Sequence, residues 1–394
     1  MKNNRTFLEK LLDGSEVEWK PLWSITTWDK RFNAVEKEKQ PKVIKYHYYL
    51  ASELKPLIVD GGNVKLLTTN ESDIWTTEEL VQNNISEGEI IAIPWGGNPI
   101  VQYYKGKFVT ADNRIATSNN TKILDNKFLY YFLLSKLDVI SSFYRGSGIK
   151  HPSMYHVLEM LIPIPPLSVQ TEIVKILDAL TALTSELTSE LTSELILRQK
   201  QYEYYREKLL SEEELGKIGV QWKALGEIVP ISRGKRLIRS QLKDNDQYPV
   251  YQNSLQPLGY YDHKNCRAYM TFVIAAGAAG EIGFSNVEFW SADDCYYFDC
   301  ANKILHDKFL YYFLLSNKHL LTNQVRKASV PRLSRVSIEK IKIPIVSFKE
   351  QERIVAILDK FETLTHSMTE GLPLAIEQSQ KRYEYYRELL LNFS

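Results

Sequence analysis

The sequence lacks both an excess of charge and long apolar runs. Its 394 residues include 49 lysines and arginines against 48 aspartates and glutamates, a formal net charge of +1. This balance argues against a protein that coats nucleic acid nonspecifically, although it allows local basic faces that acidic helices offset. No apolar run approaches the roughly 18 residues of a membrane span, and no N-terminal signal peptide is recognisable. We therefore expect a soluble, cytoplasmic protein with no membrane partner.

The signatures of catalysis and of metal binding are also lacking. The three cysteines show neither zinc spacing nor a disulfide framework, and the seven histidines form no ligand-spaced set. No nucleotide-binding G-x-x-x-x-G-K-[ST] loop is present, because Gly234-Lys235 has no upstream glycine in register. We therefore predict no catalytic residue, no metal ligand and no cofactor on this chain, which favours a binding or scaffold protein over an enzyme.

The sequence does contain a long internal repeat. Lys127–Ser135 recurs residue for residue as Lys308–Ser316, 181 positions later. Two further segments return at the same interval: Ile162–Ile164 as Ile343–Ile345, and Tyr202–Glu207 as Tyr383–Glu388. The chain is therefore two copies of one unit, each a globular part followed by a helix. A duplicated body suggests a duplicated target, such as a two-part site on a polymer.

The repeat is also circular. Val17–Leu22 resembles Val220–Leu225, and each of these motifs follows a Glu-Lys-Leu-Leu run. The C-terminal Arg387–Leu391 stops where the next such motif would begin, and the N-terminal region carries that missing piece. Joining the two ends gives a closed ring of two units, which predicts a body with approximate two-fold symmetry.

Each unit is predicted to continue into a long helix. From about residue 168 to 210 the chain has no glycine or proline, and its apolar residues recur at coiled-coil spacing. Inside this segment Thr-Ser-Glu-Leu occurs three times, from Thr184 to Leu195, and its leucines form a row that slants along the helix. The predicted partner is a C-terminal helix, about Phe348 to Leu391, which Gly371-Leu372-Pro373 should break or kink. Length and repeat favour an exposed antiparallel coiled coil over an ordinary core helix.

The globular parts are predicted to mix helices and strands. Glu89–Ile93 and Met270–Ile274 have the pattern of buried strands, and each runs into a glycine turn. The repeated Lys-Phe-Leu-Tyr-Tyr-Phe segment has a helical face, and we expect its aromatic side chains to pack on the sheet as core. The predicted fold class is therefore α+β: two globular domains, each followed by a long helix, with the helices pairing as an antiparallel coiled coil with pseudo-two-fold symmetry.

Basic residues gather in short runs within this neutral chain. Such groups hold phosphate, and nearby amide side chains read base edges. The candidate DNA-binding residues are Lys30, Arg31, Arg145, Lys150, His151, Arg233, Lys235, Arg236, Arg239, Arg326, Lys327 and Arg332, with Gln252 and Asn253 as base readers. His151 matches Arg332 at the interval of the repeat. For any single residue of this set, a solvated basic face is the alternative.

Several motifs together resemble a known family. The Ile-Pro-Ile-Pro-Pro-Leu-x-x-Gln segment at Ile162–Gln170, the Tyr-Glu-Tyr-Tyr-Arg segments starting at Tyr202 and Tyr383, the Gly-Leu-Pro at Gly371 and the central tetrapeptide repeat are typical of the specificity (S) subunit of type I restriction–modification enzymes. The resemblance covers essentially the whole chain. It is strong over the helices and their junctions and weak inside the globular parts.

The resemblance implies a division of labour. Residues 1–165 and 216–346 would be two target recognition domains, each reading one half of a split DNA sequence. Residues 166–215 and 347–394 would be conserved helical regions that set the spacing and dock two methyltransferase (M) subunits, with restriction (R) subunits as further partners. S-adenosylmethionine, ATP and Mg would belong to those partner subunits, and adenine methylation requires base flipping. Two alternatives stay open: a coiled-coil scaffold that bridges two non-DNA partners, and an enzyme whose site has no recognisable motif.

Overall fold

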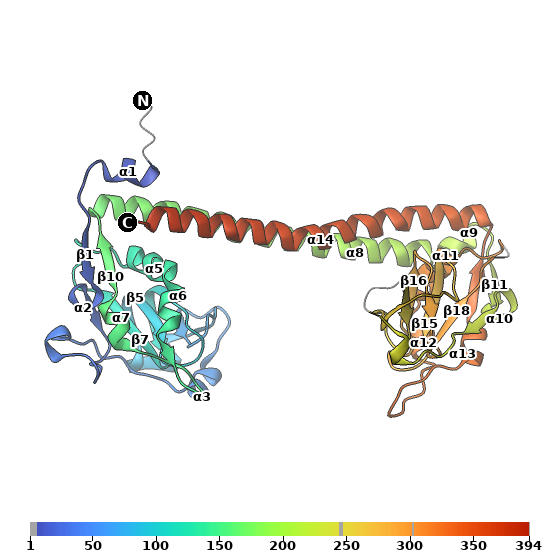
Figure 1. Cartoon of the computed structure of the whole chain (residues 1–394), viewed down its shortest axis with the longest axis horizontal. Helices are drawn as coiled ribbons and strands as arrows, with labels where there is room; N and C mark the ends of the chain where they lie inside the picture. The colour runs from blue at the N-terminus through green and yellow to red at the C-terminus, as the bar shows by residue number, and fades with distance from the viewer. Residues whose placement is uncertain (1–5, 244–246, 302, 394) are drawn as a thin grey trace. The chain divides into compact units, whose positions relative to one another are not determined.

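The computed structural model describes residues 6–243, 247–301 and 303–393 of the chain. Two compact units are present, the first formed by Met1–Thr188 with Ala375–Ser394 and the second by Ser189–Leu374. The long helices α8 (Leu167–Leu209) and α14 (Phe348–Leu391) each contribute one part to either unit (Figure 1). Within the described ranges, none of the helices combines the length and the apolar character that a membrane span requires.

The first unit is built on a six-stranded mixed sheet. Its strand order is β2-β7-β5-β6-β3-β4, with β3 and β6 parallel and the other neighbours antiparallel. The strands are β2 (Thr26–Trp28), β7 (Asn113–Ser118), β5 (Ser86–Pro94), β6 (Gln102–Thr110), β3 (Val64–Leu67) and β4 (Trp75–Thr76). The predicted strand at Glu89–Ile93 is therefore the centre of β5, and four of its five residues become a continuous buried run.

The second unit holds a smaller central sheet. Four strands lie in the order β12-β18-β15-β16, and three more form a separate sheet in the order β14-β13-β17. The strands are β12 (Ile231–Arg233), β18 (Cys295–Phe298), β15 (Met270–Ile274), β16 (Ile282–Ser285), β14 (Gly259–Tyr261), β13 (Tyr248–Tyr251) and β17 (Trp290–Ser291). The predicted strand at Met270–Ile274 is β15, and all five of its residues are buried.

Matching two-stranded ladders close the globular part of each unit. In the first unit β1 (Glu18–Pro21) pairs with β10 (Leu161–Ile164), and Trp19 lies opposite Pro163. In the second, β11 (Gln221–Ala224) pairs with β19 (Lys342–Ile345), and Trp222 lies opposite Pro344. The repeated Trp motif and the repeated Ile-Pro-Ile motif therefore pair in the same register in both units. The start of each globular part thus pairs with its own end, and the chain from Ala375 onward belongs to the first unit, as a circular repeat predicts.

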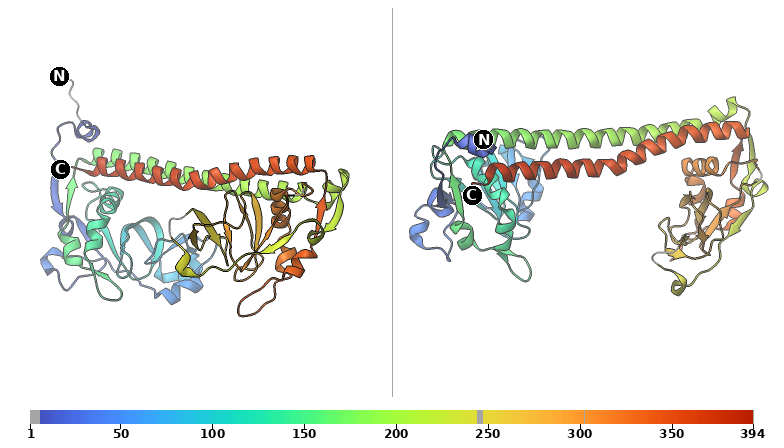
Figure 2. Two further views of the ribbon diagram at one scale, coloured as in Figure 1. Left: turned by 45° about the vertical axis from the view of Figure 1, so that its right-hand side comes forward. Right: turned by 45° about the horizontal axis from the view of Figure 1, so that its top comes forward.

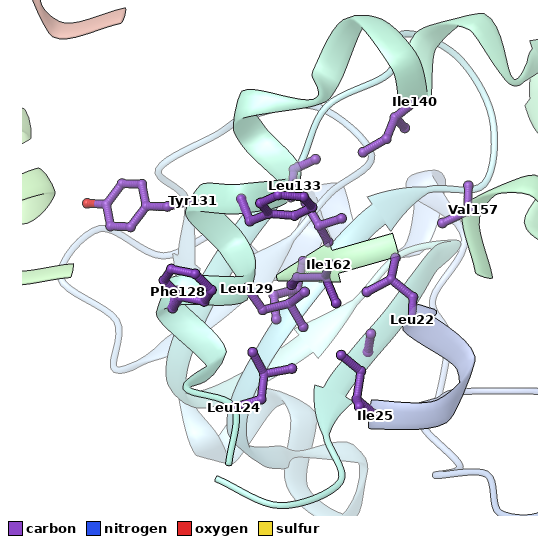
Figure 3. Packing of buried hydrophobic residues seen from close by; sticks show 14 of the residues in the cluster. Leu22, Ile25, Leu124, Phe128, Leu129, Tyr131, Leu133, Ile140, Val157 and Ile162 are labelled. Carbon is purple, nitrogen blue, oxygen red and sulfur yellow. The ribbon is translucent and has the colours of Figure 1, made fainter. Parts of the chain in front are cut away.

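The repeated Lys-Phe-Leu-Tyr-Tyr-Phe segment forms α5 (Asn126–Ser135) in the first unit and α11 (Asp307–Ser316) in the second. Phe128, Leu129 and Leu133 of α5 are fully buried in a cluster with residues of β10 and of the segments around it (Figure 3). The Tyr131 hydroxyl points away from this cluster (Figure 3). The expectation that these aromatic side chains form core is confirmed in both units.

A buried glutamine fixes the start of each long helix. The Gln170 side chain accepts a bond from the Asp125 amide at 2.9 Å and donates to the carbonyls of Ile123 and Pro165, both at 2.8 Å. Gln351 repeats all three bonds with His306, Ile304 and Val346, at 2.8, 2.9 and 2.9 Å. Both side chains are fully buried. The glutamine of the Pro-Pro-Leu-x-x-Gln motif therefore joins three chain segments at the junction between globular part and helix.

Further along each long helix, an aspartate ties it to α5 or α11. Asp178 accepts from the Tyr131 hydroxyl at 2.6 Å and pairs with the Lys127 ammonium at 2.8 Å. In the second unit Asp359 holds Tyr312 and Lys308 at the same two distances. These contacts explain why lysine and tyrosine recur at identical places in both copies. They hold α8 against α5 in the first unit and α14 against α11 in the second.

Within each unit the two long helices pack against one another. In the first unit Leu390 and Leu391 of α14 share a cluster with Ile173 and Leu177 of α8. In the second unit Tyr205 of α8 stacks on Phe361 of α14, with ring centroids 4.9 Å apart. Further views show these pairings from other sides (Figure 2). The predicted helix pairing is thus confirmed in each unit by itself.

Two details of the helices qualify the sequence analysis. The structure assigns a continuous helix from Phe348 to Leu391 with Pro373 inside, so the helix does not break at Gly-Leu-Pro, and a kink there stays a prediction. Leu183 and Leu187 are exposed, whereas Leu191 and Leu195 are partly buried. The burial of these leucines changes along the row because they are four residues apart. Each step therefore turns about 40° beyond a full circle and moves the side chain to a different face of the helix.

Short elements connect these parts. The remaining helices and strands are α1 (Phe7–Leu12), α2 (Leu22–Ile25), η1 (Lys37–Lys39), α3 (Ala51–Leu54), η2 (Lys55–Leu57), α4 (Glu78–Val81), η3 (Gln82–Asn84), α6 (Leu137–Ser142), β8 (Tyr144–Arg145), β9 (His151–Pro152), α7 (Met154–Glu159), α9 (Glu212–Lys217), α10 (Leu225–Ile228), η4 (Arg239–Gln241), α12 (His319–Thr322) and α13 (Arg335–Glu339). Helices and sheets are mixed throughout, which confirms the α+β class.

Candidate nucleic-acid interface

Three strand ends meet at one edge of each central sheet. In the first unit β2 and β5 end where β7 begins, with Trp28 opposite Ala116 and Pro94 opposite Asn113. In the second unit β12 and β15 end where β18 begins, with Arg233 opposite Tyr296 and Ile274 opposite Cys295. We call this edge the basic edge of each unit, since the predicted basic residues before and after these strands converge on it.

A short loop carrying cations is attached to each basic edge. In the first unit Arg145 and His151 pair across an antiparallel bridge, which closes the loop 145–151. In the second, Arg326 donates its amide to the Arg332 carbonyl at 2.8 Å and accepts the return bond at 3.2 Å, which closes the loop 326–332. We call these loops the two basic hairpins. They lie at the same interval as the sequence repeat, so Arg145 matches Arg326 and His151 matches Arg332.

Backbone bonds fix each basic hairpin to the turn that follows the central strand. The Gly97 amide donates to the Lys150 carbonyl at 3.1 Å, and the His151 ring bonds the Trp95 carbonyl through Nδ1 at 2.6 Å. In the second unit the Gly277 amide donates to the Pro331 carbonyl at 3.3 Å. Gly277 has φ +84°, and a Cβ there would lie 2.9 Å from the Asn253 carbonyl oxygen. Each predicted glycine turn therefore anchors the basic hairpin of its unit through a backbone hydrogen bond.

The hairpin cations are not neutralised within the protein. Arg145, Lys150, Arg326, Lys327 and Arg332 are all exposed, and their side chains form no ion pair in the part of the chain that the structure describes. His151 is exposed as well. Unpaired cations on a fixed, protruding loop are suited to binding phosphate, because no internal carboxylate competes for them.

Lys30 and Arg31 follow β2 directly and so lie at the first basic edge. The Arg31 guanidinium donates to the carbonyls of Gln40 and Pro41, both at 3.2 Å, which fixes the loop that follows. The Lys30 ammonium lies 5.2 Å from the centre of the Tyr48 ring. Arg31 therefore holds a loop of the free protein in place, while the Lys30 side chain is half-exposed.

Sequence reasoning missed a buried ion pair behind this edge. Arg114 at the start of β7 lies 3.2 Å from Asp29 and 2.5 Å from Asp112, and Asp29 also accepts from the Tyr48 hydroxyl at 2.6 Å. Burial raises the pKa of the Asp29 carboxyl, against the lowering effects of the Tyr48 hydrogen bond and the Arg114 charge. Arg114 also lies over Trp95, 4.5 Å from its ring centre. The sequence signal for this pair was Arg114 itself, a single charged residue in a strand of otherwise uncharged residues.

In the second unit Arg233 and Lys235 lie at the basic edge. The Arg233 side chain donates to the Asp293 carbonyl at 2.6 Å. The Lys235 amide donates to the Ser291 carbonyl at 2.9 Å, and the Trp290 indole donates to the Lys235 carbonyl at 2.9 Å, so the backbone is fixed while the side chain stays exposed. Arg236 and Arg239 follow on an exposed segment outside the sheet.

Gln252 and Asn253 lie beside the glycine turn that anchors the second hairpin. The Asn253 carbonyl accepts from the Ala278 amide at 3.0 Å, and the Gln252 carbonyl accepts from the Cys295 thiol at 3.0 Å. The Asn253 side chain is exposed and that of Gln252 is partly so. The structure thus brings Arg233, Lys235, Gln252, Asn253 and the second hairpin to one edge, although they are spread over almost a hundred positions of sequence.

The described residues of the two edges show no arrangement for metal chemistry. Among the residues that the structure describes, no group of three or more His, Cys, Asp or Glu side chains could hold a metal ion. The three cysteines are buried and unpaired, and burial raises the pKa of the Cys266 thiol to about 12. The two edges instead present exposed cations and amide side chains beside hydrogen-bonded backbone.

Comparison with known proteins decides the family. The model of the type I restriction modification DNA specificity domain matches twice, over residues 33–196 and 217–378. The chain belongs to this family. Over its full length it is 41% identical to the full length of a Haemophilus influenzae protein named as a putative type I restriction enzyme specificity subunit. It is 31% identical to the Escherichia coli EcoR124I/EcoR124II specificity subunit, over 98% of this chain and 97% of that one.

Solved structures share the fold of this family member. A chain from a structural study of complex assembly and conformational transition in a type I system aligns with a TM-score of 0.65, at 14% identity, over 96% of this chain and 98% of that one. The type I S subunit of M. genitalium aligns with a TM-score of 0.53, at 18% identity, over 100% of this chain and 98% of that one. Each of the two family matches lies within one copy of the repeat, so each copy contains one specificity domain.

Proposed function

We propose that this chain is the DNA specificity subunit of a type I restriction–modification complex, and that each unit reads one half of a bipartite target. Family membership supports the general role. The observation that carries the two-part reading is the pair of basic hairpins, which occupy equivalent positions on equivalent sheet edges. Their cations contact phosphate and set the register, while side chains that differ between the units read the bases.

The division between shared and differing residues supports this reading. The contacts that join globular part to helix are the same in both units, down to the three bonds of Gln170 and Gln351. The basic edges differ: Trp95 and Lys150 in the first unit correspond to Ala276 and Pro331 in the second. Two different half-sites require different edges, whereas two identical methyltransferase subunits require equivalent docking surfaces.

We assign the chemistry to partner subunits. Two methyltransferase subunits dock on the helical regions and bring S-adenosylmethionine to a flipped adenine, and restriction subunits add ATP- and Mg-dependent cleavage. The whole complex works in the cytoplasm. The support for this assignment is the absence of a nucleotide loop and of a ligand-spaced set in the sequence, together with the family's name as a specificity domain.

Selection from random duplex DNA tests the proposal. The chain assembled with its methyltransferase subunits should enrich two short fixed motifs separated by a spacer of constant length and free sequence. A scaffold that bridges non-DNA partners predicts no enrichment even with methyltransferase subunits present. An enzyme with an unrecognised site predicts turnover of a substrate by the purified chain alone.

A further inference from the structure

Each basic hairpin carries an exposed aliphatic side chain near its tip. Ile149 is 70% exposed and Val330 is 48% exposed. The two residues match at the interval of the repeat, and each directly precedes the position whose carbonyl is held by a glycine amide, at Lys150 and at Pro331. Single exposed aliphatic residues are common on protein surfaces. A matched pair, each within a loop of unpaired cations, is a more specific arrangement.

The hairpins cannot easily bury these side chains by folding back. The first is held by the Arg145–His151 bridge, by the hydrogen bond from the Gly97 amide, and by the bond between the His151 ring and the Trp95 carbonyl. Gly96 lies directly beneath it, since a Cβ at that position would come within 2.9 Å of the Ile149 Cγ2 atom. In the second unit Leu333 donates its amide to Ala275 at 2.8 Å immediately after the loop closes. The loop between α12 and α13 projects from its globular part in Figures 1 and 2.

We propose that Ile149 and Val330 are wedges, each inserted between two neighbouring base pairs of its own half-site when the cations beside it bind the flanking phosphates. The inference rests on the proposed function and adds a contact that phosphate binding does not require. A β-branched side chain suits this task, because its few χ1 rotamers leave little entropy to lose. Apolar side chains inserted between neighbouring base pairs unstack that step and kink the duplex.

The charge around each wedge supports the same geometry. Arg145, Lys150 and His151 flank Ile149 in the sequence, and Arg326, Lys327 and Arg332 flank Val330. Kinking a duplex brings phosphates together, and nearby unpaired cations lower the electrostatic cost of that approach. No acidic side chain lies within either loop sequence.

Fluorescence of 2-aminopurine, a base analogue that brightens when unstacked, tests the wedge. The probe is placed in turn at each position of the two half-sites, leaving out the methylated adenines because base flipping brightens those. The wild-type complex with its methyltransferase subunits should brighten one step in each half-site. Ile149→Ala should abolish the signal in the first half-site only, and Val330→Ala in the second only. Each change should also weaken binding roughly tenfold, the scale for one buried aliphatic side chain.

Matched controls separate the outcomes. Ile123 is 47% exposed and lies outside the hairpin, so Ile123→Ala should leave both signals and the affinity unchanged. Brightening that survives Ile149→Ala and Val330→Ala would overturn the inference, and so would weaker binding without any change in stacking, which indicates a groove contact instead. Failure of the variants to assemble with methyltransferase subunits would also overturn it. A wild-type complex that binds no specific site would overturn the proposed function itself.

Discussion

Replacing Gln170 by methionine should loosen the globular part of the first unit from α8. Methionine has nearly the same length and helix propensity as glutamine but cannot form the three bonds. The change deprives the Asp125 amide and the carbonyls of Ile123 and Pro165 of the partner that the buried Gln170 side chain supplies. Each unsatisfied group costs roughly 1–3 kcal/mol, so the three together should lower the unfolding free energy by roughly 3–5 kcal/mol after methionine packing offsets part of the loss.

The repeat supplies a matched replicate and α8 supplies a control. Gln351→Met removes the same three bonds in the second unit, so its cost should be similar. The two sites share no partner, so their effects should add in the double variant. Gln199 is exposed on α8, and Gln199→Met should change the stability by less than about 0.5 kcal/mol.

Hydrogen exchange read by mass spectrometry is the suitable assay, because a chain of two units need not unfold in one step. Gln170→Met should speed exchange in peptides from α5 and the start of α8, and Gln351→Met should do so in α11 and the start of α14. Exchange unchanged at both junctions would refute the reasoning that these buried bonds fix helix to globular part. A uniform decrease of protection over the whole chain would show that the junctions do not act locally.

Three further predictions concern charge, symmetry and spacing. Replacing Arg233, Lys235, Arg236 and Arg239 by alanine should weaken DNA binding by the assembled complex while methyltransferase binding is retained. The slope of log K against log salt concentration should fall by about one for each phosphate that is no longer bound. An unchanged slope in a salt titration would mean that this run is only a solvated face. A fragment of residues 1–215 should dimerise, because its own Tyr202–Glu207 can replace the repeated Tyr383–Glu388 of the first unit, and with methyltransferase subunits it should direct methylation to an inverted repeat of the first half-site. Sedimentation that shows only monomer at micromolar concentration would count against it. Deleting Thr188–Leu191 removes ~6 Å of helix and ~40° of twist, so mapped target sites should keep both half-sites and lose one or two base pairs of spacer. An unchanged spacer with full activity would show that the Thr-Ser-Glu-Leu array does not set the distance.

The elements that the sequence predicted well are those whose evidence is local or repeated. Helix periodicity predicted α8 and α14, and the recurrence of Lys127–Ser135 at Lys308–Ser316 predicted two equivalent units. At Pro373 the sequence allowed a break or a kink, and the helix does not break there, because a proline removes only one amide donor from a helix of 44 residues.

The candidate site was predicted in its residue types but not in its architecture. Nothing in the sequence places Asn253 beside Gly277, or Gly277 beside Pro331, because those contacts depend on the register of strands that are distant along the chain. The Arg114–Asp29 pair was missed for the same reason: the partners are 85 positions apart and only β2–β7 pairing brings them together. That these basic residues contact DNA stays a prediction.

The central claim is that two different units of one chain read the two halves of one DNA target. Mapping methylated adenines across the genome of cells that carry the methyltransferase subunits, with and without this chain, tests it most directly. The account predicts methylation that depends on the chain and falls in a motif of two fixed halves around a spacer of constant length. Methylation unaffected by removal of the chain, or confined to one continuous motif, would contradict it.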